Sequence, residues 1–101
     1  MAFGHSLHLD VYDVAESLCD DLGFCYRLLD DLAAFLAMNK QSPPFVFISP
    51  DDQYPDKRGI SGWVPLIESG ISIHTLTCAR FVTLDIYTCG RLDPAEAIGF
   101  V

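Results

Sequence analysis

The segment RFVTLDIYTC, residues 80–89, carries the clearest structural pattern in the chain. Its apolar residues Val82, Leu84 and Ile86 alternate with other residues such as Asp85, so they fall on one side of an extended backbone. A period of two is typical of a β-strand with one buried and one open face. The chain is therefore expected to build a sheet that needs covering on one side.

Further extended segments are predicted at residues 5–12, 45–49 and 61–69, with extended chain continuing over residues 71–77. The first of them alternates as residues 80–89 do, and the second is rich in residues that favour strands. Pro65 lacks the N–H that an interior strand would use, so the third segment is expected at a sheet edge or a bulge.

One amphipathic helix is predicted over residues 14–38, where apolar residues recur at steps of three and four. Gly23 is a poor interior residue, so the helix is expected to be interrupted or to start late near it. A second helix is predicted at residues 93–101, with Asp93 as N-cap and Pro94 at the first helical position.

The order of elements is β-α-β-β-β-α, which predicts an α+β fold. We expect a two-layer sandwich in which an antiparallel sheet carries helices on one face. Residues 1–101 form a single domain, and a chain of this length buries a modest core, so a partner subunit would help it.

The charge balance excludes some ligands. Fourteen acidic against 6 basic residues give a net charge of -8, which repels a phosphate backbone and attracts a cationic small molecule. Nucleic acid is therefore not expected as a partner. No apolar run approaches the roughly 20 residues that cross a bilayer, and the N-terminus has no secretory pattern. A cytoplasmic protein without membrane contact is expected.

The cysteines and histidines do not predict a metal site or a disulfide framework. The four cysteines, Cys19, Cys25, Cys78 and Cys89, have no C-x-x-C spacing. Cys19 and Cys25 lie on the predicted helix and are expected in the core. His5 and His8 are three residues apart on a strand and so point to opposite faces.

Four polar side chains in or beside the predicted sheet have reactive potential, namely Ser61, Ser69, His74 and Cys89. Two of them belong to ESGISIHT, residues 68–75, where a carboxylate, hydroxyls and an imidazole interrupt apolar residues. Taken singly, each has an ordinary explanation as a turn residue, a structural histidine or a small core residue.

Together these residues coincide with a family pattern. Residues 59–90, GISGWVPLIESGISIHTLTCARFVTLDIYTCG, resemble the bacterial form of S-adenosylmethionine decarboxylase. That family shows G-[VI]-S-G, then E-S-H-[IL]-[ST]-I-H-T, then an aspartate-containing strand that ends in C-G, and the spacing is matched here without a gap. GHSLHLDVY, residues 4–12, also resembles the family's opening strand.

The resemblance implies an enzyme that makes its own pyruvoyl cofactor from Ser69. The chain would cleave itself between Glu68 and Ser69, with Ser61 and His74 as the processing serine and histidine. The pyruvoyl group would form a Schiff base with the α-amine of the substrate and accept electrons as carbon dioxide leaves. Cys89 matches the family cysteine that reprotonates the product.

The chain also departs from the family pattern around the substrate. Gly70 replaces the histidine that follows the reactive serine, Leu76 replaces a tryptophan that would stack on adenine, and Cys78 replaces a glutamate that would hold the ribose hydroxyls. Tyr54 lies near the position of a second stacking aromatic residue. The candidate substrate contacts are therefore Glu68, Leu76 and, weakly, Tyr54.

Three functions follow from the resemblance. The first is decarboxylation of S-adenosylmethionine for polyamine synthesis, here of spermidine. The second keeps the chemistry but takes a cationic amino acid such as ornithine or arginine, which Leu76 and Cys78 favour. The third is an unprocessed, non-catalytic homologue. The family's bacterial members imply a homodimer or a higher homo-oligomer.

Overall fold

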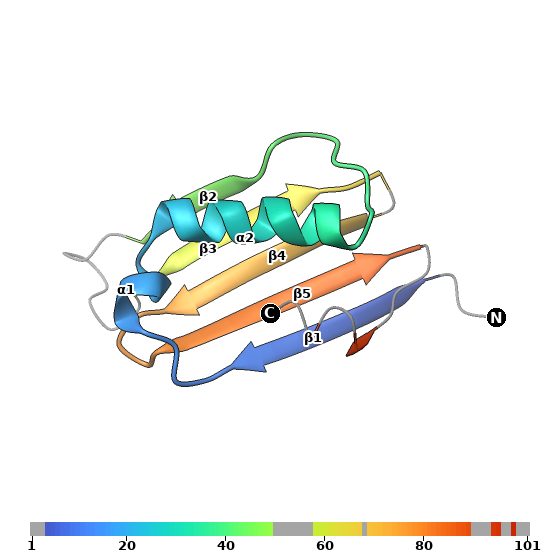
Figure 1. Ribbon diagram of the computed structural model, residues 1–101. Coiled ribbons are helices and arrows are strands. Elements are labelled where there is room, and N and C mark those ends of the chain that lie inside the picture. Colours follow the sequence, from blue (N-terminus) through green and yellow to red (C-terminus); the bar gives the residue numbers. More distant parts are fainter. Residues whose placement is uncertain (1–3, 50–57, 68, 90–93, 96–97, 99–101) are drawn as a thin grey trace.

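The computed structural model describes residues 4–49, 58–67, 69–89, 94–95 and 98. Its named elements are two helices and five strands that pack as two layers (Figure 1). Along the chain they are β1 (His5–Val11), α1 (Glu16–Cys19), α2 (Leu22–Phe35), β2 (Phe45–Ile48), β3 (Ile60–Pro65), β4 (Ser69–Leu76) and β5 (Phe81–Thr88).

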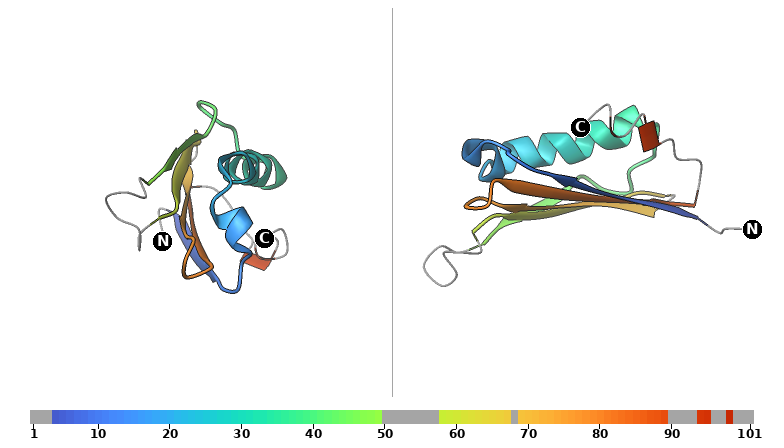
Figure 2. Two further views of the ribbon diagram at one scale, coloured as in Figure 1. Left: turned by 90° about the vertical axis from the view of Figure 1, so that its left-hand side faces the viewer. Right: turned by 90° about the horizontal axis from the view of Figure 1, so that it is seen from below.

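The five strands form one antiparallel sheet in the order β1-β5-β4-β3-β2. Both named helices lie on the same face of this sheet, as the edge-on view of Figure 2 shows. The predicted α+β sandwich, with an antiparallel sheet and helices on one face, is confirmed. No helix among the described residues is long and apolar enough to cross a membrane.

The core lies between the sheet and α2. The apolar residues that alternate along the predicted strands face the helices. Ile73, Leu84 and Ile86 are fully buried there. Cys19 and Cys25 are also fully buried, which confirms that they belong to the core. Burial raises the pKa of the Cys25 thiol to about 11, so this thiol stays protonated and unreactive.

The helical region is interrupted near Gly23, as predicted, but the cause differs. Two helices replace the single one expected over residues 14–38, and the second begins because Asp21 caps it. The N–H of Phe24 donates to Oδ1 of Asp21 over 3.0 Å, which satisfies a free donor of the first turn. Gly23 lies inside α2, so the cap, and not the glycine, sets the boundary.

The sheet also has one strand more than predicted, because the chain turns back between Pro65 and Ser69. The N–H of Leu66 donates to the carbonyl of Ser69 over 2.9 Å, and this turn divides β3 from β4. The edge position expected from Pro65 is wrong, since β3 pairs on both sides. Proline is tolerated as the last residue of β3 because pairing with β2 has already ended at Trp63.

The second face of the sheet, called the open face below, is covered by no described helix or strand (Figure 2). It is built from alternate residues of all five strands, namely Ser6, His8 and Asp10, Phe45 and Phe47, Ser61 and Trp63, Ser72 and His74, and Thr83, Asp85 and Tyr87. Its aromatic side chains are prominent, with Phe47 68% exposed and Trp63 48% exposed.

The predicted C-terminal helix falls mostly outside the described residues. Pro94, Ala95 and Ile98 are helical, whereas the expected N-cap Asp93 is not among the described residues.

Candidate active site

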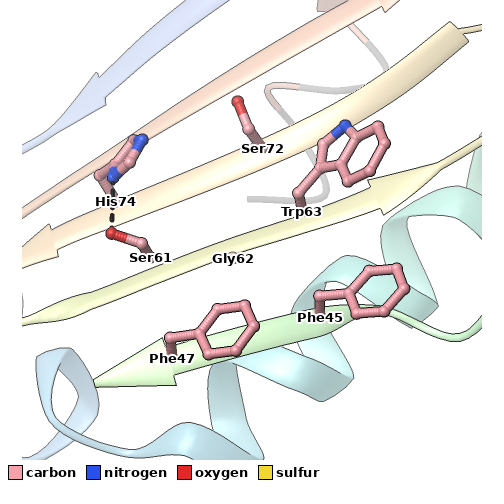
Figure 3. A pocket seen from close by; sticks show the side chains of 7 residues that line it. All are labelled: Phe45, Phe47, Ser61, Gly62, Trp63, Ser72 and His74. Atoms are coloured by element: carbon pink, nitrogen blue, oxygen red, sulfur yellow. Dashed lines mark hydrogen bonds between the residues drawn. The ribbon is translucent and has the colours of Figure 1, made fainter. Parts of the chain in front are cut away.

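Ser61 and His74 form a hydrogen-bonded pair on the open face. They lie directly opposite each other on β3 and β4, so the sheet register holds their side chains side by side. Oγ of Ser61 and Nδ1 of His74 are 3.0 Å apart (Figure 3). A hydroxyl bonded to an imidazole is suited to passing a proton to or from a third group.

An apolar hollow of about 430 Å³ surrounds this pair. Phe45 and Phe47 of β2 and Trp63 of β3 supply its aromatic walls (Figure 3). The rings of Phe45 and Trp63 stack with centroids 6.3 Å apart and planes inclined by 21°. Such an arrangement keeps Trp63 in place beside the polar pair.

Ser69 occupies a different part of the sheet. It is the first residue of β4 and pairs with Thr88, near the end of β5. Its Oγ is buried and has no hydrogen-bond partner among the described residues. A buried hydroxyl normally finds a partner, so an unpaired one calls for a functional explanation. Glu68, the other side of the predicted cleavage point, lies outside the described residues.

Cys89 lies at the same end of the sheet as Ser69. It follows Thr88, the residue that pairs with Ser69, and its side chain is exposed. Partial burial, together with a side-chain hydrogen bond to Cys89, raises the pKa of the Tyr87 hydroxyl. Cys89 and Tyr87 therefore touch each other at the residue-69 end of β4.

A second hollow, of about 390 Å³, opens beside Ser69. It is lined by Ser6, Trp63, Ser69, Gly70, Ser72, Asp85, Ile86 and Tyr87. Trp63 and Ser72 contribute to both hollows, so these two residues form the boundary between them.

The four candidate catalytic residues thus form two groups within one protomer. His74 follows Ser69 by five residues along β4, and a strand rises about 3.3 Å per residue, which separates them by roughly 16 Å. The Ser61–His74 pair cannot reach Ser69 in the same chain across that distance. Cys89, by contrast, is close to Ser69.

A further polar cluster on the open face was not predicted. His8 contacts two carboxylates, with Nδ1 2.6 Å from Oδ1 of Asp85 and Nε2 2.7 Å from Oδ1 of Asp10. These hydrogen bonds, the one to Asp85 first, raise the pKa of His8. The sequence contained a hint, since His8, Asp10 and Asp85 share one face by alternation, but the pairing of β1 with β5 was not readable from it.

Comparison with known proteins identifies the family. A family model described as S-adenosylmethionine decarboxylase matches residues 5–101. The chain belongs to this family. An S-adenosylmethionine decarboxylase proenzyme of Symbiobacterium thermophilum is 31% identical over 98% of this chain and 70% of its own length.

Two further proteins resemble this chain, one over nearly all of it and one over less than half. The crystal structure of the adenosylmethionine decarboxylase from Aquifex aeolicus superposes with a TM-score of 0.76 at 28% identity, over 97% of this chain and 73% of that chain. An arginine decarboxylase proenzyme of Pyrobaculum arsenaticum is 43% identical, but only over 46% of this chain and 35% of its own length.

Four positions near the substrate, at which this chain was compared with the family pattern above, can now be placed in the structure. Gly70 lies directly under the indole of Trp63, because a Cβ atom at position 70 would come 2.8 Å from Nε1 of Trp63. Leu76 is the last residue of β4 and lies beyond His74, far from Ser69 of the same chain. Cys78 is exposed after β4, and Tyr54 lies outside the described residues.

Metal ligation has no support among the described residues, where no cluster of three or more His, Cys, Asp or Glu side chains is placed to hold an ion. Cys19, Cys25 and Cys89 form no disulfide.

Proposed function

We propose that this protein is a self-processing, pyruvoyl-dependent decarboxylase that acts on S-adenosylmethionine. The observation that carries the proposal is the buried Oγ of Ser69, which has no hydrogen-bond partner among the described residues, in a chain of this family. Decarboxylation of S-adenosylmethionine yields the aminopropyl donor for spermidine, so the enzyme would serve polyamine synthesis. The buried thiols of Cys19 and Cys25, which form no disulfide, suit the reducing cytoplasm, where we place the enzyme.

The first task of the chain is to cleave itself. Oγ of Ser69 attacks the carbonyl carbon of Glu68, so that the peptide bond becomes an ester and the nitrogen of residue 69 becomes a free amine. Loss of the α-proton of residue 69 then expels the carboxylate of Glu68 as a new C-terminus. Addition of water and loss of ammonia convert residue 69 into the pyruvoyl group.

The residues present fit this group. An Oγ without a hydrogen-bond partner is free to act as a nucleophile, whereas a bonded one would first have to lose its partner. When formed, the pyruvoyl group supplies a carbonyl that accepts electrons during decarboxylation. Cys89, beside residue 69, would hold the proton at Sγ that the product carbon receives.

The Ser61–His74 pair would assist self-cleavage in the partner subunit. Within one protomer it lies roughly 16 Å from Ser69 along β4, which is too far for proton transfer. We therefore propose a homodimer that packs through the open face, so that the pair of one subunit approaches residue 69 of the other. The exposed aromatic residues of this face support the proposal, since uncovered apolar patches mark association surfaces.

Intact-mass measurement tests the cleavage. The purified protein is expected to consist of a 68-residue and a 33-residue chain in place of one chain of 101 residues. The variant Ser69→Ala is expected to remain a single chain, because it has no hydroxyl to attack residue 68. Release of labelled carbon dioxide from carboxyl-labelled S-adenosylmethionine tests the reaction itself.

A single uncleaved wild-type chain that releases no carbon dioxide would disprove the proposal and favour the non-catalytic homologue. A second candidate, decarboxylation of arginine or ornithine, is favoured by Leu76 and Cys78 in place of the family's tryptophan and glutamate. A panel of these three substrates decides between them, and preference for S-adenosylmethionine would exclude the second candidate.

A further inference from the structure

Tyr87 lies beside the place where residue 69 would react. It belongs to β5 and pairs with Gly70 of β4, the residue that follows Ser69. Its side chain lies on the open face, where it lines the hollow of about 390 Å³ beside Ser69. Cys89 follows two residues later, just past the end of β5. The tyrosine is therefore close to both the predicted cleavage point and the predicted proton donor.

Two contacts fix the position of the Tyr87 hydroxyl. A Cβ atom at Gly4 would lie 2.7 Å from Oη of Tyr87 and 2.8 Å from the carbonyl oxygen of Thr88. Both oxygens thus lie close to one point beside the start of β1, and the ring of Tyr87 runs along β5 toward its end. There a side-chain hydrogen bond joins Tyr87 to Cys89. Gly4 has no side chain, which leaves the hydroxyl room to reach this position.

Proton transfer from Cys89 would create a charge that needs a hydrogen-bond donor. When Sγ gives its proton to the product carbon, the S–H bond breaks, a C–H bond forms and the electron pair of the S–H bond stays on sulfur. The nearby hollow already holds the carboxylate of Asp85, so a second anion beside it is unfavourable. A hydrogen bond from a hydroxyl to an anion is about twice as strong as one between neutral groups. The phenol of Tyr87 can supply such a bond, since its O–H is a donor.

We propose that Tyr87 positions the thiol of Cys89 for proton transfer and stabilises the thiolate that remains. This inference rests on the proposed function. The phenol donates Oη–H to Sγ and keeps its own proton, so Tyr87 is a positioning residue and not the acid itself. The thiolate takes a proton from water as the product leaves, and the site is then ready for the next substrate.

NMR titration of the uncleaved variant Ser69→Ala tests the contact without the cofactor. Partial burial, followed by the hydrogen bond to Cys89, raises the pKa of the Tyr87 hydroxyl. With tyrosines isotope-labelled at Cζ, the further change Cys89→Ala is expected to lower the ionisation midpoint of Tyr87, whose signal is the one that Tyr87→Phe removes. Cys78→Ala, at the other exposed cysteine, is the matched control and should leave that midpoint unchanged. A midpoint that is the same with and without Cys89 would overturn the inference.

Turnover of the cleaved enzyme tests the role of the hydroxyl. Tyr87→Phe keeps the ring and removes only the donor, so kcat per cleaved chain is expected to fall about ten-fold with KM within about two-fold. Substrate binding should be spared because the thiolate forms only during the reaction. Tyr12→Phe is the matched control, because Tyr12 is 68% exposed and follows β1 at the opposite end of the sheet from Cys89. That variant should behave like the wild type.

A double variant separates this role from a merely structural one. Because Tyr87 acts through Cys89, adding Tyr87→Phe to Cys89→Ala is expected to cost no further activity. A second loss of about ten-fold in the double variant would show that Tyr87 acts elsewhere, and it would overturn the inference. Circular dichroism of each variant checks that the fold is retained.

The two proposals fail in different ways. If the wild-type protein cleaves and decarboxylates but Tyr87→Phe behaves like Tyr12→Phe, the role of Tyr87 is disproved and the proposed function stands. If the wild-type protein neither cleaves nor releases carbon dioxide, both proposals are disproved, even where the titration shows that Tyr87 bonds Cys89.

Discussion

His8 is the residue whose charge is most clearly set by its neighbours. Both ring nitrogens face carboxylates, and the hydrogen bonds to Asp85 and Asp10 raise the pKa of the imidazole. Oγ1 of Thr83 also lies 3.3 Å from Nε2. The charge of this cluster on the open face therefore depends on pH.

The pKa of His8 is raised in the folded protein, so protonation stabilises the fold. The contribution is fully present below the unfolded-state pKa of about 6.5 and is lost as pH rises through the raised native value. Chemical denaturation of the wild type and of His8→Asn, followed between about pH 5.5 and 9, is expected to show a difference that shrinks as pH rises. His5→Asn, on the same strand, is the control, and a difference that grows with pH would contradict the prediction.

Gly70 permits a second test at the scale of one residue. Gly70→Ala places a methyl group where the indole of Trp63 lies, so the flexible indole is expected to move rather than the backbone. The emission maximum of the single tryptophan should then shift in the ligand-free protein. An emission spectrum identical to that of the wild type would show that the two residues are not in contact.

At the scale of the elements, the packing of α2 on the sheet depends on Gly62. The helix contacts β2, β3 and β4, and a Cβ atom at residue 62 would lie 2.8 Å from Cγ1 of Val46, 3.0 Å from Cγ2 of Ile73 and 3.1 Å from Cδ1 of Leu29. Side chains of three elements, β2, β4 and α2, meet at this residue, so a methyl group here would have to displace all three. A glycine is needed here for close approach.

Gly62→Ala is accordingly expected to lower the free energy of unfolding by about 1–3 kcal/mol, the usual cost of overpacking a core. Gly23→Ala is the matched control, because its Cβ would meet only the ends of the Arg27 and Asp21 side chains. That change is expected to raise the free energy of unfolding by up to about 1 kcal/mol, since alanine favours a helix. Urea denaturation measures both, and equal effects would show that α2 does not rest on Gly62.

At the scale of the whole molecule, the open face is a surface that no described helix or strand of the protomer covers. It holds the Ser61–His74 pair near one end of β4, with exposed aromatic side chains beside it, whereas residue 69 begins the strand at the other end and its side chain points to the covered face. A second copy that packs on this face in the opposite direction would bring each pair to the partner's residue 69. The proposed enzyme is then complete only as a dimer.

Complementation between two inactive chains tests this arrangement. His74→Asn and Ser69→Ala, each expected to remain uncleaved alone, are produced together with different tags. In a mixed dimer the intact pair of the Ser69→Ala chain faces Ser69 of the His74→Asn chain, so only the latter is expected to be cleaved. Mass spectrometry of the separated chains shows the result. Cleavage of His74→Asn by itself, or no cleavage in the mixture, would contradict the proposal.

Much of the fold was predictable because it depends on local periodicity. The alternation of residues 80–89 and 5–12 placed two strands and their buried faces correctly, and the helical period placed Cys19 and Cys25 in the core. The edge position expected from Pro65 is wrong because a turn ends β3, and the predicted break near Gly23 is present but is set by the cap of Asp21. Both are short-range contacts of single residues, which a periodic pattern does not record.

The sequence by itself determined the α+β class, the covered and open sides of the strands, and the family through the spacing of Ser61, Ser69, His74 and Cys89. Only the tertiary structure decided that Ser61 bonds His74 at a distance from Ser69, and that the indole of Trp63 lies over Gly70. The physical reason is register. Which residues of two strands meet depends on the turns and on the packing of α2, and these contacts join parts of the chain that no local pattern connects.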